Sequence, residues 1–162
     1  MNWQAIGTVA EIVSALAVVI TLAYLAVQIR DSARASRAAA VTDATTGMQA
    51  WYQELGSSAE SAKLFLDGMK NPDALSSPDR FQFVMLVHAA FLGFQRSFFL
   101  SRAGTLDVSL RDSIGTAVRA VNRMPGMAYY WEHRKAFFQQ EFAEWVEELL
   151  AREAVSVGIF GE

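Results

Sequence analysis

The stretch Ile12–Ile29, with the sequence IVSALAVVITLAYLAVQI, has 18 consecutive residues and no charged side chain. Counting back to Ala5 gives 25 residues in which Glu11 is the one charge. A helix rises about 1.5 Å per residue, so about 20 residues cross a hydrocarbon layer of about 30 Å. No proline interrupts the stretch, and we therefore expect residues 5–29 to form one transmembrane helix. The alternatives are a buried core helix, which usually has a shorter apolar run, and a cleaved signal peptide.

The residues on either side of this stretch favour an anchor that is not cleaved. Ala33-Arg34-Ala35 resembles a cleavage site, but the leader, residues 1–4, has no positive side chain. The apolar run also exceeds the 7–15 residues of a signal peptide. Positive charges collect on the cytoplasmic side of a membrane, and here they follow the stretch. We therefore expect the N-terminus outside and the C-terminal domain in the cytoplasm, with lipid headgroup and topology contacts from Trp3, Arg30, Arg34 and Arg37.

Polar and small residues inside the stretch fall on one side of the predicted helix. They recur at alternating steps of four and three residues, which is the 3.5-residue repeat of a left-handed helix pair or bundle. Because lipid offers polar groups no partner, we expect this side to face protein or trapped water. We call these positions the polar stripe; they are Gly7, Glu11, Ser14, Val18, Thr21, Leu25 and Gln28.

Glu11 is the charged member of the stripe. A charged residue near the bilayer centre costs about 2.5–3.5 kcal/mol on insertion scales, and less toward the interface. Two interpretations follow. Glu11 carboxyls form a proton- or cation-handling ring in a homo-oligomer, or each one bonds to a neighbouring helix or reaches the headgroups. We favour the second.

The rest of the chain predicts an all-α fold, a cytoplasmic helical bundle of about five helices. Residues 30–40 contain no helix breaker and form a juxtamembrane helical extension, residues 41–154 form the bundle, and residues 155–162 form a short apolar tail. We expect this tail to dock on its own bundle rather than on a partner. No internal repeat or low-complexity tract suggests a further domain.

Serine, glycine and proline residues predict the limits of the helices. Gly56 ends the first, Ser57 caps a second that stops near residues 71–72, and Ser77 caps a third that ends at Gly104. A helix over residues 106–123, a turn at Pro125-Gly126 and one long helix over residues 127–154 complete the bundle. The third helix is the most apolar, but its uncharged part, residues 81–95, is short for a second membrane span.

Composition and motifs give little support to catalysis. The absence of cysteine excludes disulfides, thiolate metal sites and cysteine nucleophiles, and a net charge of −3 gives no footprint for nucleic acid. No phosphate-binding loop, nucleophile elbow or zinc motif occurs. We predict no enzyme, no catalytic residue, no cofactor and no metal site.

Histidine, glutamate and aromatic residues of the bundle are the remaining candidates for a binding site. His88 is expected to be a core histidine with a partner, and His133 is expected to be exposed. Glu141, Glu144 and Glu148 share a helix face and could hold a divalent cation, but a solvated acidic face is the simpler explanation. Tyr129-Tyr130-Trp131 beside Arg134 and Lys135 could stack on a ring or bind a partner, but aromatic packing in the bundle is the simpler explanation.

The N-terminal sequence resembles a large group of small bacterial membrane-anchored proteins with no agreed activity. The resemblance rests on Trp3–Gly7, Glu11–Val13 and Ala17–Arg30. Near the other end it rests on Pro125-Gly126, Tyr130-Trp131, Arg134, Phe138, Phe142 and Val146. The group often has a second tryptophan where this chain has Tyr130. The resemblance implies a bacterial inner-membrane protein with one span.

These observations lead to a functional prediction. We expect a non-enzymatic, membrane-anchored helical module that assembles with itself or serves as an accessory or scaffold subunit of a larger membrane complex. The alternative is a small homo-oligomeric ion or proton channel lined by Glu11, Ser14, Thr21 and Gln28.

Overall fold

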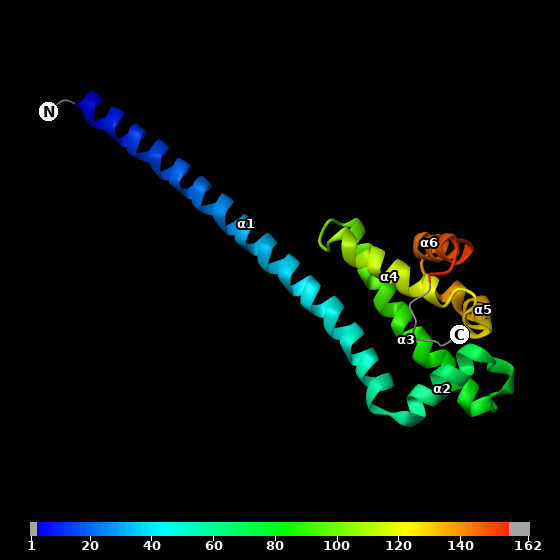
Figure 1. Ribbon diagram of the computed structural model, residues 1–162. Coiled ribbons are helices and arrows are strands. Elements are labelled where there is room, and N and C mark those ends of the chain that lie inside the picture. The colour runs from blue at the N-terminus through cyan, green and yellow to red at the C-terminus, as the bar shows by residue number, and fades with distance from the viewer. Residues whose placement is uncertain (1–2, 156–162) are drawn as a thin grey trace. The chain divides into compact units, whose positions relative to one another are not determined.

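The computed structural model describes the backbone of residues 3–155 and the side chains of residues 7, 9 and 11–155. Within these residues the chain forms six α-helices and two 3-10 turns, and it contains no strand, so the all-α prediction is confirmed (Figure 1). The α-helices are α1 (Trp3–Ser57), α2 (Ala59–Lys70), α3 (Ser77–Arg102), α4 (Val108–Ala120), α5 (Pro125–Arg134) and α6 (Gln140–Ala151). The 3-10 turns are η1 (Pro72–Ala74) and η2 (Lys135–Phe137). The chain divides into two compact units, Met1–Ala39 and Ala40–Glu162.

The first unit is the N-terminal part of α1. Every side chain from Glu11 to Ala39 is exposed, and the large apolar ones range from 47% exposed at Leu25 to 70% at Ile29. An 18-residue window of this helix has a mean hydropathy of 2.4, and none of it is buried. By length and composition, α1 is therefore able to cross a membrane. The leader residues 1–2, and the side chain of Trp3, lie outside the described residues.

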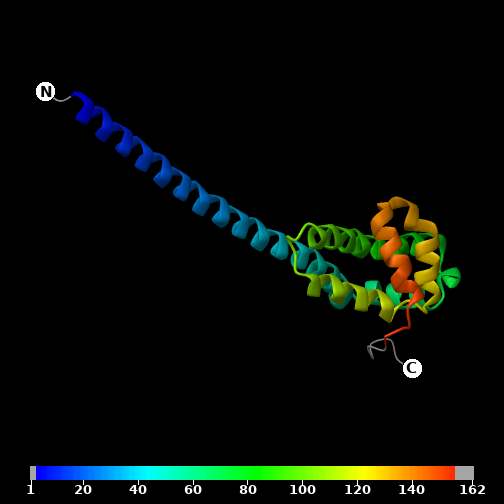
Figure 2. The same ribbon diagram turned by 90° about the horizontal axis from the view of Figure 1, so that it is seen from above.

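The second unit is a helical bundle built around α3. Helices α2, α4 and α5 pack on α3, while α6 packs against α4 (Figure 2). Aromatic and aliphatic side chains from α2 to α6 fill the centre, and several are fully buried: Phe83, Ile114, Met127, Tyr130, Phe142 and Val146. Helix α3 is also long and apolar enough to span a membrane, but 39% of its window is buried in the bundle. This burial supports the interpretation of α3 as a core helix.

The caps of α2 and α3 each lie one residue from the predicted position. Ser58, not Ser57, caps α2, and its Oγ accepts a hydrogen bond from the backbone nitrogen of Ser61 at 3.1 Å. Ser57 stays in the last turn of α1 and donates its hydroxyl to the carbonyl of Gln53 at 2.6 Å. In the same way Ser76, not Ser77, caps α3. Neighbouring serines have the same capping chemistry, so only the backbone angles decide which one accepts the bond.

Gly104 ends α3 as predicted. Its φ is +68°, the left-handed conformation that glycine adopts at little cost. The amide nitrogen of Thr105 donates to the carbonyl of Leu100 at 3.0 Å. This closes the end of the helix and lets the chain turn toward α4.

The prediction of a turn at Pro125-Gly126 is wrong, because these residues begin α5. The turn lies just before them, over residues 121–124, and α4 ends at Ala120 instead of continuing to residue 123. Proline suits the first turn of a helix, where its missing amide hydrogen is not needed. Gly126 is buried and has only a hydrogen as side chain, so α5 approaches α2 closely at Gly68.

The prediction of one long helix over residues 127–154 is also wrong. The chain leaves helical geometry at Phe138, whose φ of −102° and ψ of 157° are extended. This break places the ring of Phe138 in the core, 8% exposed, while Phe137 remains 65% exposed. As a result α6 packs along α4. Of the predicted tail, Val155 is half-buried, and residues 156–162 lie outside the described residues.

Candidate functional site

The polar stripe belongs to the exposed part of α1, and its spacing on a helix puts its members on one side. All seven positions are exposed, and nothing lies within 4 Å of the place where a Cβ at Gly7 would sit. Two members bond within the helix. The hydroxyl of Thr21 donates to the carbonyl of Ala17 at 2.8 Å, and Nε2 of Gln28 donates to the hydroxyl of Tyr24 at 3.0 Å. These bonds reduce the number of polar groups that the stripe offers to a partner.

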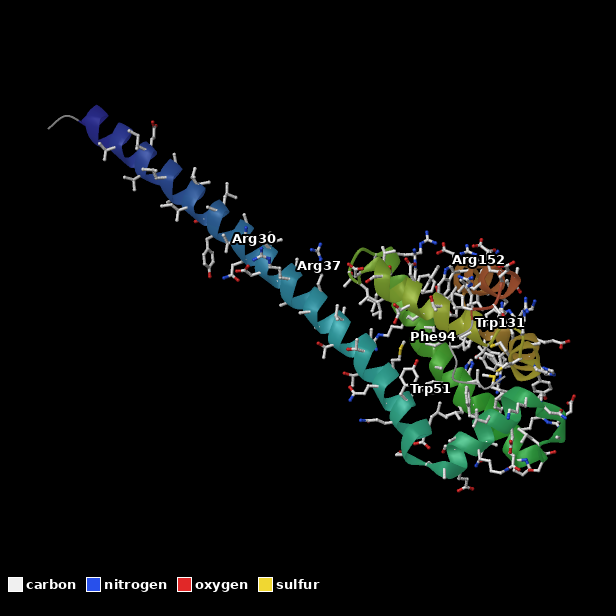
Figure 3. All side chains as sticks on the ribbon, viewed as in Figure 1. Arg30, Arg37, Trp51, Phe94, Trp131 and Arg152 are labelled. Atoms are coloured by element: carbon white, nitrogen blue, oxygen red, sulfur yellow. The ribbon has the colours of Figure 1, made fainter. Side chains whose placement is uncertain are left out.

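Arginines follow the apolar stretch directly. Arg30, Arg34 and Arg37 are exposed on α1, and Arg34 lies 3.8 Å from the carboxylate of Asp31. Figure 3 labels Arg30 and Arg37 on this part of the helix. An exposed pair of this kind contributes little free energy, so the arginines remain available to anionic headgroups.

In the bundle, the histidine that the sequence placed in the core has a partner. Nδ1 of His88 and the hydroxyl of Tyr130 form a hydrogen bond of 3.0 Å, and the ring of Phe138 is 5.1 Å from the histidine ring. Partial burial lowers the pKa of His88, and the positive charge of Arg134 lowers it further. Burial raises the pKa of Tyr130 well above its ordinary value, so its hydroxyl stays protonated.

The other aromatic residues and His133 show structural packing. Trp131 is buried and stacks on Phe138 with the ring centres 5.8 Å apart, and Tyr129 is half-buried. His133 is exposed as expected, stacks on Tyr129 at 4.3 Å and donates from Nδ1 to the Tyr129 carbonyl at 2.8 Å. These contacts give the cluster a role in the bundle that needs no ligand.

Two of the three glutamates that share a face of α6 bond to neighbours. Glu141 accepts from Arg102 at 2.7 Å, and Glu144 accepts from Gln140 at 2.8 Å. Within the described part of the chain, no group of three or more metal-binding side chains comes together. The three glutamates that share a helix face are therefore not brought together with further ligands.

The structure also contains an apolar hollow that the sequence analysis did not find. It has a volume of about 560 Å³ and lies in the second unit between the end of α1 and helices α2, α3 and α4. Trp51 and Phe94, both labelled in Figure 3, are among its lining residues. Its walls come from residues far apart in the sequence, so periodicity along one helix gives no signal for it. The alanines in its walls indicate a space between helices only when it is known which helices pack together.

Together the fold and these sites define a class of protein: an all-helical chain that joins an exposed apolar N-terminal helix to a helical bundle. Comparisons with protein-family models, with curated proteins and with solved structures found no match.

Proposed function

We propose that this protein is a membrane-anchored helical module without enzymatic activity, inserted through α1. One observation carries the proposal: the apolar side chains from Val9 to Ile29 are exposed all around the helix. An apolar surface of this length is unfavourable in water and needs a cover of lipid or protein. The arginines that follow it favour an orientation with the bundle in the cytoplasm and the N-terminus outside.

The polar stripe supports assembly as the purpose of this anchor. A lipid-facing helix gains nothing from polar side chains, whereas a helix–helix interface uses small and hydrogen-bonding residues. The proposed partner is a second copy of the chain or another subunit of a membrane complex. Glu11 then bonds across the interface.

Single-cysteine crosslinking tests the interface cleanly because the natural chain has no cysteine. In membranes, Ser14→Cys lies on the stripe, and the control Leu16→Cys lies about 200° around the helix. We expect an oxidant to link Ser14→Cys chains to one another or to a co-purifying subunit, several times more than Leu16→Cys chains. Equal, low crosslinking at both positions with no co-purifying protein would contradict the assembly proposal.

The channel is a second candidate function, favoured by the exposed carboxyl of Glu11 on the same side as Ser14. Thr21 and Gln28 bond within their own helix, which leaves fewer hydroxyl and amide groups to line such a channel. A channel predicts a closed ring of five or more copies and a pH-dependent conductance in vesicles that changes in Glu11→Gln. Conductance no higher than that of empty vesicles would exclude it.

A further inference from the structure

The apolar hollow exists because small side chains face it where large ones would fill the bundle. Four alanines contribute to its walls: Ala62 from α2, Ala90 from α3, and Ala117 and Ala120 from α4. The remaining lining is mainly aromatic and aliphatic and reaches the buried core at Phe65, Met69, Val87, Phe91, Val118 and Met127. Protein interiors are normally close-packed, so a space of this size calls for an occupant.

Water is a poor occupant of this space. A buried water needs about three hydrogen-bond partners, and no charged residue lines the hollow. Three polar groups of the lining already have partners. Trp51 Nε1 donates to the carbonyl of Leu86 at 2.8 Å, Ser113 to that of Ser109 at 2.9 Å, and Thr116 to that of Asp112 at 3.1 Å.

The walls are held in place by contacts of the lining residues with one another and with the backbone of α3. The bond from Trp51 fixes the end of α1 to α3, and the Trp51 and Phe65 rings meet edge to face with centres 5.7 Å apart. On α3, the rings of Phe91 and Phe94 are 5.3 Å apart. Preformed apolar pockets of about 300–1,000 Å³ are typical of small-molecule sites.

We propose that the hollow binds one acyl chain of a fatty acid or lipid. The chain lies among the apolar walls, and the polar head stays in solvent beyond the rim, where Ser113 and Thr116 are exposed. The uncharged lining selects the hydrocarbon part and excludes a charged group from the interior. This inference concerns the second unit alone and does not rest on the insertion of α1.

Photolabelling tests the proposal with the full chain in phosphatidylcholine nanodiscs. The probe is palmitic acid with a diazirine in its chain, and the labelled residues are identified by mass spectrometry. We expect labels on lining residues such as Leu66 and Phe94, and excess unlabelled palmitic acid removes them because the site is saturable. Labels along residues 12–29 report membrane contact independently, so the failure of one proposal is distinguishable from that of the other.

Variants that fill the hollow provide the decisive comparison. Ala117→Leu is expected to lower labelling of the lining about tenfold, the loss that follows when about two methylene groups lose their site. Ala128→Leu, on the exposed side of α5, is the control and leaves labelling unchanged. Ala62→Leu enters the hollow from α2 and serves as a second variant if Ala117→Leu misfolds. Unlabelled lining residues, or labelling that neither filling variant reduces, would overturn the proposal.

Discussion

His88 has a pKa below its ordinary value because folding partly buries its ring beside Arg134. In the unfolded chain both effects disappear, and the ring takes up a proton near pH 6.5. Between these two pKa values the unfolded state binds more protons than the folded state. Stability therefore rises with pH through this range and falls when the solution is made more acidic.

We predict that the free energy of unfolding of the bundle is lower at pH 5.5 than at pH 7.5, and that His88→Gln removes this part of the dependence. The measurement is chemical unfolding of the full chain in detergent, followed by circular dichroism at a series of pH values. His133→Gln is the matched control, since His133 is exposed, and the dependence persists in it. If the free energy of unfolding depends on pH in the same way in His88→Gln and in the natural chain, His88 is not the group that lowers stability in acid.

At the scale of elements, the crossing of α2 and α5 depends on glycines. A Cβ on Gly126 would collide with the carbonyl oxygen of Gly68 and the Cα of Met69, which are backbone atoms and cannot rotate away. A Cβ on Gly68 would overlap the ring of Phe83. The two helices therefore meet at a distance that only glycine permits.

Gly126→Ala is predicted to destabilise the bundle by about 1–3 kcal/mol, the usual cost of overpacking. Gly93→Ala, in α3, is the matched control because nothing lies within 4 Å of its new methyl group. It is expected to stabilise by up to about 1 kcal/mol through helix propensity. Denaturant unfolding of both variants gives the comparison. A neutral Gly126→Ala would show that α2 and α5 do not meet as described.

The elements also show how far sequence reasoning reaches. Polarity and periodicity identify α1, α2 and α3, because their signals lie within one helix. The break at Phe138 has no such signal, since no glycine or proline marks it and its cause is the burial of one ring against other helices. At Pro125 a signal exists, because proline is favoured at the first position of a helix as well as in a turn. The hollow is lined by residues of several helices, so no single helix carries a sequence pattern that predicts it.

At the scale of the whole molecule, we predict that the second unit lies on the cytoplasmic side of the membrane. A single cysteine in place of the exposed Ala136 belongs to the second unit and reports its side of the membrane. We expect an impermeant maleimide to miss Ala136→Cys in intact cells and to label it after permeabilisation. Equal labelling before and after permeabilisation would reverse the proposed orientation.

Extraction of the full chain from membranes tests most directly whether α1 resides in lipid. We predict that the chain stays in the membrane pellet after an alkaline carbonate wash and that only detergent releases it. Its mass is then still the 17.9 kDa of the sequence. A chain that enters the wash as a monomer, or one that has lost its first thirty or so residues, would contradict it.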